Sequence, residues 1–171
     1  HQGRLLELKL QAKQVPYHLS GGTSFFARGE VKDIMSYLRV LVNPEDDSAF
    51  LRIVNVPRRK IGTSTLQVLG EYATERNCSL FNAIGELGLQ HRMPESSYQR
   101  LQKFSDWFVN LQRQLIDGDA IALVKELVSD IDYEGWLHQN SSSASVAERR
   151  MENVQFLINS VAKELDKIKA E

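Results

Sequence analysis

The sequence has few of the features that mark a disulfide-bonded, membrane-spanning or strongly basic protein. Its one cysteine, Cys78, excludes an internal disulfide and fits a reducing compartment. No apolar run approaches the ~20 residues that span a bilayer, so we expect no membrane partner and a cytoplasmic location. The 21 Lys and Arg residues nearly balance the 22 Asp and Glu residues, and the net charge of −1 provides no global basic field for nucleic acid. Any such binding has to come from a local patch.

Catalytic and metal-binding motifs are absent as well. The sequence contains no GxxxxGK[ST], GxGxxG, HExxH or CxxC, and its four histidines show no metal-ligand spacing. Asp46 and Asp47 make a poor acid/base pair, because adjacent residues of a helix point about 100° apart. Negative charge in the first turn of a helix explains them better. The sequence therefore predicts no catalytic residue, no metal site and no cofactor site within this chain.

What the sequence does contain is a series of amphipathic helical patterns. Apolar residues make up 42% of the chain and charged residues 25%, a globular composition with enough length for a sizeable core. After residue 22 the apolar residues recur at helical spacing and no alternating strand pattern follows. We therefore expect a mainly α fold. Before that point we expect a short helix over 4–14, a brief strand over 17–19 and a turn or swivel at Gly21 and Gly22.

Several helix boundaries can be predicted. Asp46 and Asp47 fall in the first turn of a short helix whose apolar face includes Leu51. Ser79 caps a further short helix that runs to Leu87, with Leu87 facing inward. Residues 139–145 are polar and rich in serine, which predicts a mobile loop.

The last predicted helix covers about 146–169 and has apolar residues at alternating spacings of three and four. This is the spacing of a heptad seam. The seam residues are Met151, Val154, Ile158, Val161, Leu165 and Ile168. We expect this seam to pack within its own domain rather than to lie free for a partner.

The most informative stretch is NVPRRKIGTSTLQVL, residues 55–69, a cationic loop that leads into a helix start. Three cationic residues at 58–60 precede Gly62, and Ser64 with Gln67 forms a capping-box pattern. The first turn of a helix leaves N–H groups unpaired at the positive end of the helix dipole. Gly62 has no side chain to block a ligand. This combination favours phosphate binding, although an ordinary capped helix after a solvated basic turn explains the same residues.

The stretch PYHLSGGTSFFARGEVKDIMSYLRVLVNPEDDSAFLRIVNVPRRKIGTSTL, residues 16–66, is very similar to part of the Rep/UvrD/PcrA family of superfamily 1 DNA helicases. The resemblance is closest to its Rep-type members, through LSGGTSFF, YLRVLVNPEDDSAFLRIVN and DYEGWL. It is dense over residues 4–87 and looser to about 160. It implies that residues 1–22 end the RecA-like motor domain 2A and that 23–171 form the helical 2B domain. The chain begins at His1 within a helical pattern, and we expect it to be a piece of a larger bacterial protein.

In this family 2B swivels between orientations, restrains unwinding by the monomer and contacts duplex DNA ahead of the fork. The resemblance implies that a GIG-type loop and the helix start after it make this contact, largely through backbone amides. The candidate DNA-binding residues here are Lys32, Arg58, Arg59, Lys60, Ile61, Gly62, Thr63, Ser64 and Thr65. Lys60 replaces the first glycine of the pattern. The resemblance also implies that Asp46, Asp47, Gly21 and Gly22 influence the orientation of 2B.

The resemblance thus predicts the duplex-binding, regulatory region of an ATP-dependent 3′–5′ helicase that acts in DNA replication or repair. The ATP-binding motifs of the family lie outside these residues, so ATP and Mg²⁺ belong to the parent helicase. The alternative is a helical module for self-association or for docking a replication partner. We expect Arg58, Arg59 and Thr65 to be exposed, so that replacing them weakens DNA binding without loss of stability.

Overall fold

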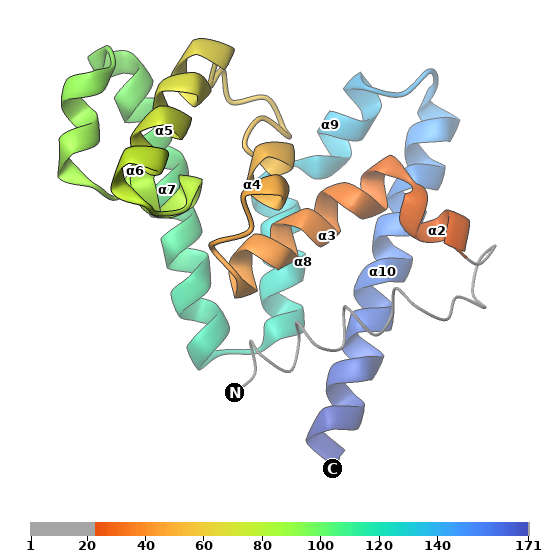
Figure 1. Cartoon of the computed structure of the whole chain (residues 1–171). Helices are drawn as coiled ribbons and strands as arrows, with labels where there is room; N and C mark the ends of the chain where they lie inside the picture. Colours follow the sequence, from red (N-terminus) through yellow and green to blue (C-terminus); the bar gives the residue numbers. More distant parts are fainter. Residues whose placement is uncertain (1–22, 171) are drawn as a thin grey trace.

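The computed structural model describes residues 23–170, with side chains described at all of these positions except 23, 117 and 165–170. Within that range the chain forms helices and no strand, which confirms the mainly α prediction (Figure 1). The predicted helix over 4–14, the strand over 17–19, Gly21 and Gly22 lie outside the described residues. The elements are α2 (Thr23–Ala27), α3 (Gly29–Val42), α4 (Asp47–Ile53), α5 (Thr63–Arg76), α6 (Leu80–Ile84), the 3-10 helix η1 (Leu87–Arg92), α7 (Glu95–Asp117), α8 (Ala120–Asp130), α9 (Tyr133–Gln139) and α10 (Ala144–Ala170).

The fold has two parts, one built from α5, α6 and α7 and the other from α8, α9 and α10, and helix α3 connects them. It packs against α4 and α7, and also against α10, which in turn contacts α8 and α9. Helices α5 and α6 pack together, and α6 contacts both α4 and α7. In Figure 1, α5, α6 and α7 lie on one side of α4, and α9 and α10 lie on the other. The long helix α7 joins the parts because it contacts α6 and then α8.

An aromatic cluster forms the core between α4, α6 and α7. Phe104 and Phe108 of α7 stack with ring centroids 5.6 Å apart, and Phe81 of α6 meets Phe108 edge-on at 5.4 Å. Phe50 of α4 meets Phe104 at 6.0 Å. Each such pair adds about 0.5–1.5 kcal/mol beyond the area it buries. This cluster fixes α4, α6 and α7 relative to one another, and with them the connection from α4 to α5.

Glu30 on α3 ties that helix to α10. It is 3% exposed, and its two carboxylate oxygens accept from Arg150 Nε at 2.9 Å and Asn153 Nδ2 at 2.8 Å. Burial by itself would raise the pKa of Glu30, but the hydrogen bonds from Asn153 and Arg150 outweigh it, and the pKa lies below its ordinary value. The carboxylate is therefore charged and internally paired.

Asp33, one turn further along α3, makes the equivalent connection to α4 and α9. Its oxygens accept from Arg52 Nε at 3.0 Å and from the hydroxyl of Tyr133 at 2.7 Å. Burial, together with the negative charge of Asp33, raises the pKa of Tyr133 far above its ordinary value, so the phenol stays protonated as the donor. Both buried acids of α3 thus have partners within the domain.

The predicted cap of α6 is confirmed, and at the start of α4 one of the two predicted acids, Asp46, forms a cap. The side chain of Asp46 accepts from the amide of Ala49 at 3.0 Å, and that of Ser79 accepts from the amide of Asn82 at 3.2 Å. Asp47 does something the sequence did not indicate. Its carboxylate accepts from the amide of Leu80 at 2.9 Å and so links α4 to the first turn of α6.

Two expectations about apolar side chains are wrong. Helix α6 ends at Ile84, because Gly85 takes the C-cap position, and Leu87 begins the following 3-10 helix with 84% of its surface exposed. Leu51 on α4 is 50% exposed, because that helix buries Ala49, Phe50 and Ile53 instead.

The seam of α10 packs within the domain, as expected, at Val154, Ile158 and Val161, all of which are buried. The side chains of Leu165 and Ile168 lie outside the described set. The predicted loop over 139–145 is shorter in the structure, where 140–143 separate α9 from α10. No helix of residues 23–170 has the length and apolar character needed to cross a membrane.

Candidate nucleic-acid interface

The start of α5 is open. Gly62 occupies the N-cap position with φ −73° and ψ 169°, and no side-chain hydrogen bond caps the helix. The amide of Leu66 donates to the carbonyl of Gly62 at 3.0 Å, so the amides of Thr63, Ser64 and Thr65 precede that first bond of the helix. The predicted capping box at Ser64 and Gln67 is therefore wrong, because the helix begins at Thr63 and places Ser64 inside its first turn.

Gly62 is not required by the backbone or by packing. Its φ is negative, and a Cβ built on it would meet no heavy atom within 4 Å. A side chain would therefore fit, and an Asp or Ser would have the N-cap geometry that these residues prefer. The glycine leaves the first amides of α5 accessible to an anion.

From Arg58 to Gly62 the loop alternates between outward and inward residues. Arg58, Lys60 and Gly62 are exposed, whereas Arg59 is half-buried and Ile61 is 2% exposed. Neither Arg58 nor Lys60 forms an ion pair with another described side chain. Two cations that have no ion-pair partner among the described residues thus precede the open helix start.

Asn55 holds the end of this loop. Its Oδ1 accepts from the amide of Ile61 at 3.0 Å, and its Nδ2 donates to the carbonyl of Ile61 at 2.7 Å. Both backbone groups of Ile61 are therefore satisfied inside the protein, and its side chain is buried. The sequence placed Ile61 among the DNA contacts; in the structure its amide already has a partner, and Ile61 anchors the loop.

Arg59 turns inward, contrary to the expectation that it is exposed. Its Nη1 donates to the carbonyls of Ile53 at 2.7 Å and Val54 at 3.2 Å, at the C-terminal end of α4. Its Nη2 donates to the hydroxyl of Tyr37 at 2.6 Å. Three acceptors within the protein thus hold the guanidinium, and replacing Arg59 should lower stability.

Tyr37 carries this contact onward to the loop. It is fully buried on α3, and its hydroxyl donates to the carbonyl of Val56. Burial raises the pKa of Tyr37, although the positive charge of Arg59 acts in the opposite direction. The phenol therefore stays protonated and can donate to Val56 while it accepts from Arg59.

The backbone of Lys60 has φ 60°, in the left-handed region. A glycine adopts this region without strain, whereas a lysine there costs on the order of 1 kcal/mol. The replacement of the first glycine of the GIG pattern therefore leaves the conformation accessible, at a modest energetic cost. Thr65 also differs from expectation, since it is only 8% exposed and its replacement affects the core as well as the site.

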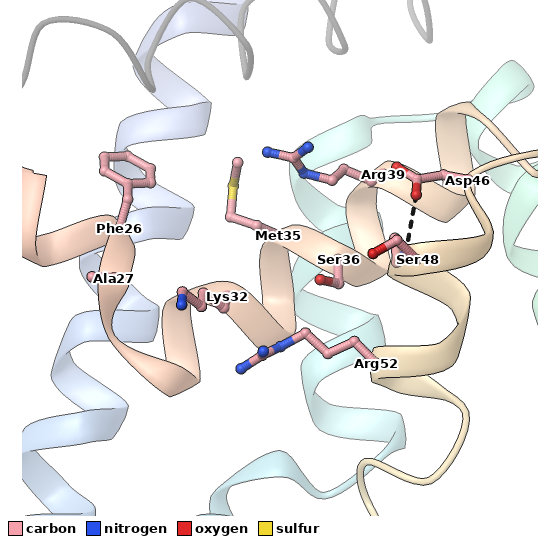
Figure 2. A pocket seen from close by; sticks show the side chains of 10 residues that line it. Phe26, Ala27, Lys32, Met35, Ser36, Arg39, Asp46, Ser48 and Arg52 are labelled. Carbon is pink, nitrogen blue, oxygen red and sulfur yellow. Dashed lines mark hydrogen bonds between the residues drawn. The ribbon is translucent and has the colours of Figure 1, made fainter.

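Lys32 lies in a separate hollow between α2, α3 and α4 (Figure 2). The hollow has a volume of about 670 Å³, and Arg39 and Arg52 also line it, with Phe26 and Met35 contributing apolar surface. None of residues 58–65 belongs to its lining. The structure thus brings 58–65 together at one helix start and leaves Lys32 on a second cationic surface.

The carboxylates of the other two predicted residues, Asp46 and Asp47, are already hydrogen-bonded within the protein. Asp46 lines the hollow but caps α4, and Asp47 is bound to the start of α6. Among the described residues no group of three or more His, Cys, Asp or Glu side chains is placed to hold a metal ion.

Sequence reasoning missed the residues that support the loop. Asn55 and Tyr37 carry no signal that separates them from ordinary surface or core residues. The one available hint was that Asn55 precedes a proline and a basic run, as turn residues do.

The described fold and site define a small helical domain with an open helix start suited to hold an anion. The whole chain, residues 1–171, matches the family model of the UvrD-like helicase C-terminal domain. This chain belongs to that family.

Its relatives by sequence identity support the same assignment to this family. It is 50% identical over 159 residues to the ATP-dependent DNA helicase Rep of Salmonella typhimurium, which covers 93% of this chain and 23% of that protein. It is 48% identical over 159 residues to Rep of Escherichia coli, covering 93% and 24%. Against the ATP-dependent DNA helicase PcrA of Staphylococcus epidermidis it is 33% identical over 156 residues, covering 90% and 21%. The resemblance to the Rep/UvrD/PcrA family is confirmed, and the chain spans about a quarter of the length of the curated Rep relatives it matches.

Proposed function

We propose that this chain is the duplex-DNA-binding, regulatory 2B region of a bacterial, cytoplasmic, ATP-dependent 3′–5′ DNA helicase that acts in replication or repair. Residues 1–22 are then the end of the motor domain 2A, and 23–171 are 2B. The observation that carries the proposal is the open start of α5, flanked by the exposed cations Arg58 and Lys60. Family membership supplies the context, because the relatives named above are ATP-dependent DNA helicases.

The proposed binding mode is electrostatic and independent of base sequence. The amides of Thr63, Ser64 and Thr65 donate to a backbone phosphate at the positive end of the helix dipole. The exposed hydroxyl of Ser64 adds a donor, and Arg58 and Lys60 supply charge. Because phosphate contacts carry no sequence information, duplexes of different sequence bind alike.

Lys32 provides a second phosphate contact in this proposal, on the surface of α3. Asp46 and Asp47 influence the orientation of 2B indirectly, since their hydrogen bonds hold α4 and α6 in place. The role of Gly21 and Gly22 as a swivel stays a prediction. ATP and Mg²⁺ serve the motor domains of the parent helicase, and this piece alone neither hydrolyses ATP nor unwinds DNA.

The alternative, a helical module for self-association or partner docking, has less support. It rested on the heptad-like face of α10 or on exposed aromatic side chains. On that face Val154, Ile158 and Val161 are buried in the domain and Met151 is half-buried, and no aromatic side chain is among the exposed large hydrophobic residues of the described chain. The exposed large hydrophobic residues of the described chain lie on three different elements: Leu51 on α4, Leu87 on η1 and Ile116 on α7.

The test is fluorescence anisotropy with two labelled duplexes of equal length and unrelated sequence. We expect weak binding that is equal for both and that falls with salt. With two or three cationic contacts, the slope of log K against log[salt] is about −2 to −3. Arg58→Glu should abolish binding at moderate salt while the midpoint of urea unfolding stays unchanged, because Arg58 is exposed.

The matched control is Arg100→Glu, which makes the same charge change at an exposed position on α7. This variant should bind as the wild type does. Equal losses from Arg58→Glu and Arg100→Glu would mean that only net charge matters. No binding by the wild type even at low salt would reject the proposed function.

A further inference from the structure

We propose that Arg59 is a positioning residue of the DNA site: it sets the shape of the loop that presents Arg58, Lys60 and the start of α5, and it does not itself contact DNA. This inference rests on the proposed function. It assigns adjacent arginines opposite roles, since Arg58 points outward as a phosphate contact and Arg59 points inward.

The hydrogen bonds of Arg59 leave its guanidinium committed to the protein. The Nη1 atom bridges the carbonyls of Ile53 and Val54, and Nη2 reaches Tyr37 on α3. Carbonyls at the end of a helix lack intrahelical partners, and a cation there is favoured by the dipole. The side chain thus closes the end of α4 at the point where the loop begins.

An aromatic box completes the site of Arg59. The centre of its guanidinium lies 4.8 Å from the ring centroid of Phe104, 5.6 Å from that of Trp107 and 5.8 Å from that of Tyr37. Such stacking is attractive, and the attraction grows as the cation is removed from water. A planar guanidinium can stack and donate to several acceptors at once, which the ammonium of lysine does not reproduce.

The box holds one end of the exposed part of the loop, and Asn55 holds the other. Through the hydroxyl of Tyr37, Arg59 is linked to the carbonyl of Val56, and Asn55 holds both backbone groups of Ile61. The segment between these two anchors contains Arg58 and Lys60. The anchors at Val56 and Ile61 therefore determine that Arg58 and Lys60 point outward, and they also determine the orientation of Gly62.

The experiment asks, at each of the two arginines, whether a lysine that keeps the positive charge also keeps the affinity for duplex DNA. Arg58→Lys keeps the charge of a phosphate contact and should bind duplex as the wild type does, whereas Arg58→Gln should reduce the salt slope by about one. At Arg59 the charge-conserving variant should not restore binding. Arg59→Lys and Arg59→Gln should both lose about tenfold in duplex affinity, because neither side chain restores the hydrogen bonds of the planar guanidinium.

Tyr37→Phe separates positioning from contact. Tyr37 is 0% exposed and cannot reach DNA, yet its hydroxyl joins Arg59 to Val56. The variant should weaken duplex binding several-fold with the salt slope unchanged, since no phosphate contact is removed. Binding is measured where urea unfolding shows each variant to be fully folded, so that global destabilisation does not enter the affinity.

The fluorescence of Trp107 reports the box directly. In a Trp136→Phe background Trp107 is the one tryptophan left, and its ring lies 5.6 Å from the guanidinium of Arg59. Arg59→Lys should change its emission, whereas Arg58→Lys should not.

Wild-type affinity in both Arg59→Lys and Tyr37→Phe, with a reduced salt slope in Arg59→Gln, would overturn the proposal and make Arg59 a direct contact. Absence of duplex binding by the wild type is a different result. It would reject the proposed function itself, and the positioning role with it.

Discussion

Two polar regions of this domain differ in whether their charged and polar groups have hydrogen-bond partners within the protein. On α3, the carboxylates of Glu30 and Asp33 are buried. The groups that donate hydrogen bonds to them all belong to this domain. At the start of α5, Arg58 and Lys60 are exposed without an ion pair to any described side chain, and the helix has no side-chain cap.

The difference separates groups that stabilise the fold from groups available to a ligand. A buried charge has to be paired, because leaving it unpaired is far more expensive than the net gain from the pair. An exposed helix start can remain open because water satisfies it when no ligand is bound. Replacing Glu30 or Asp33 should therefore affect stability and leave DNA binding alone, and replacing Arg58 or Lys60 should do the reverse.

The largest expected effect comes from Glu30→Gln. The variant loses a charge-assisted pair with Arg150 and places an amide NH₂ in a site built from donors, and it should lower the free energy of unfolding by about 2 kcal/mol. Urea unfolding measures this, and duplex affinity measured on the folded protein should not change. A variant as stable as the wild type would show that the α3 network is not closed in solution.

The same pair predicts a dependence on pH. The pKa of Glu30 is lower in the folded protein than its ordinary value of 4.5, so its contribution to stability is present above about pH 4.5. It is lost as the pH falls through the folded pKa, because the carboxyl group then takes up a proton. The difference in stability between wild type and Glu30→Gln should therefore shrink in acid; a difference that grows in acid would contradict the assignment.

Gly62→Asp should make the open helix start resemble the capped ones. The aspartate fits without a clash and caps α5, so stability should rise by a few tenths of a kcal/mol. Duplex affinity should fall by about tenfold, because the carboxylate occupies the amides and repels phosphate. Gly62→Ser, a cap without charge, is the control and should show a smaller loss. Stronger DNA binding in Gly62→Asp would contradict the account.

Asp46→Ala makes the complementary change at a capped start. Removing the hydrogen bond to the amide of Ala49 should lower stability by about 1 kcal/mol. Thermal or urea unfolding measures the loss. Duplex affinity of the folded variant should match the wild type, and a larger loss of affinity than of stability would place the start of α4 in the DNA site.

Lys60→Gly should give the smallest change. Glycine removes the strain of φ 60° but adds freedom to the unfolded chain, so the two effects nearly cancel, and stability should stay within about 0.5 kcal/mol. The loss of one charge should reduce the salt slope by about one and the affinity by a few-fold. An unchanged slope would show that Lys60 does not contact phosphate.

The fold was predictable where periodicity and caps carry the signal. The apolar residues of α3, α7 and α10 recur at helical spacing, and Asp46 and Ser79 are capping residues by type. The exposure of Leu87 was not predictable, because its inward position assumed that α6 continues beyond Ile84, whereas Gly85 ends the helix one turn earlier.

The candidate site was predictable as a location but not in its detail. The basic run, Gly62 and the helix start are all visible in the sequence. Arg58 and Arg59 have the same local signature, and only the tertiary contacts of Arg59 with α3, α4 and α7 separate them. Non-local pairs such as Asp33 with Tyr133, 100 residues apart, leave no sequence signal of their own.

The most direct test of the central claim is a titration of the ¹⁵N-labelled chain with unlabelled duplex, followed by amide chemical shifts. The account predicts that the largest shifts fall on Gly62, Thr63, Ser64 and Thr65, with smaller shifts on Arg58 and Lys60, and that the amide of Ile61 moves little. Shifts concentrated on α10, with none at the start of α5, would contradict it.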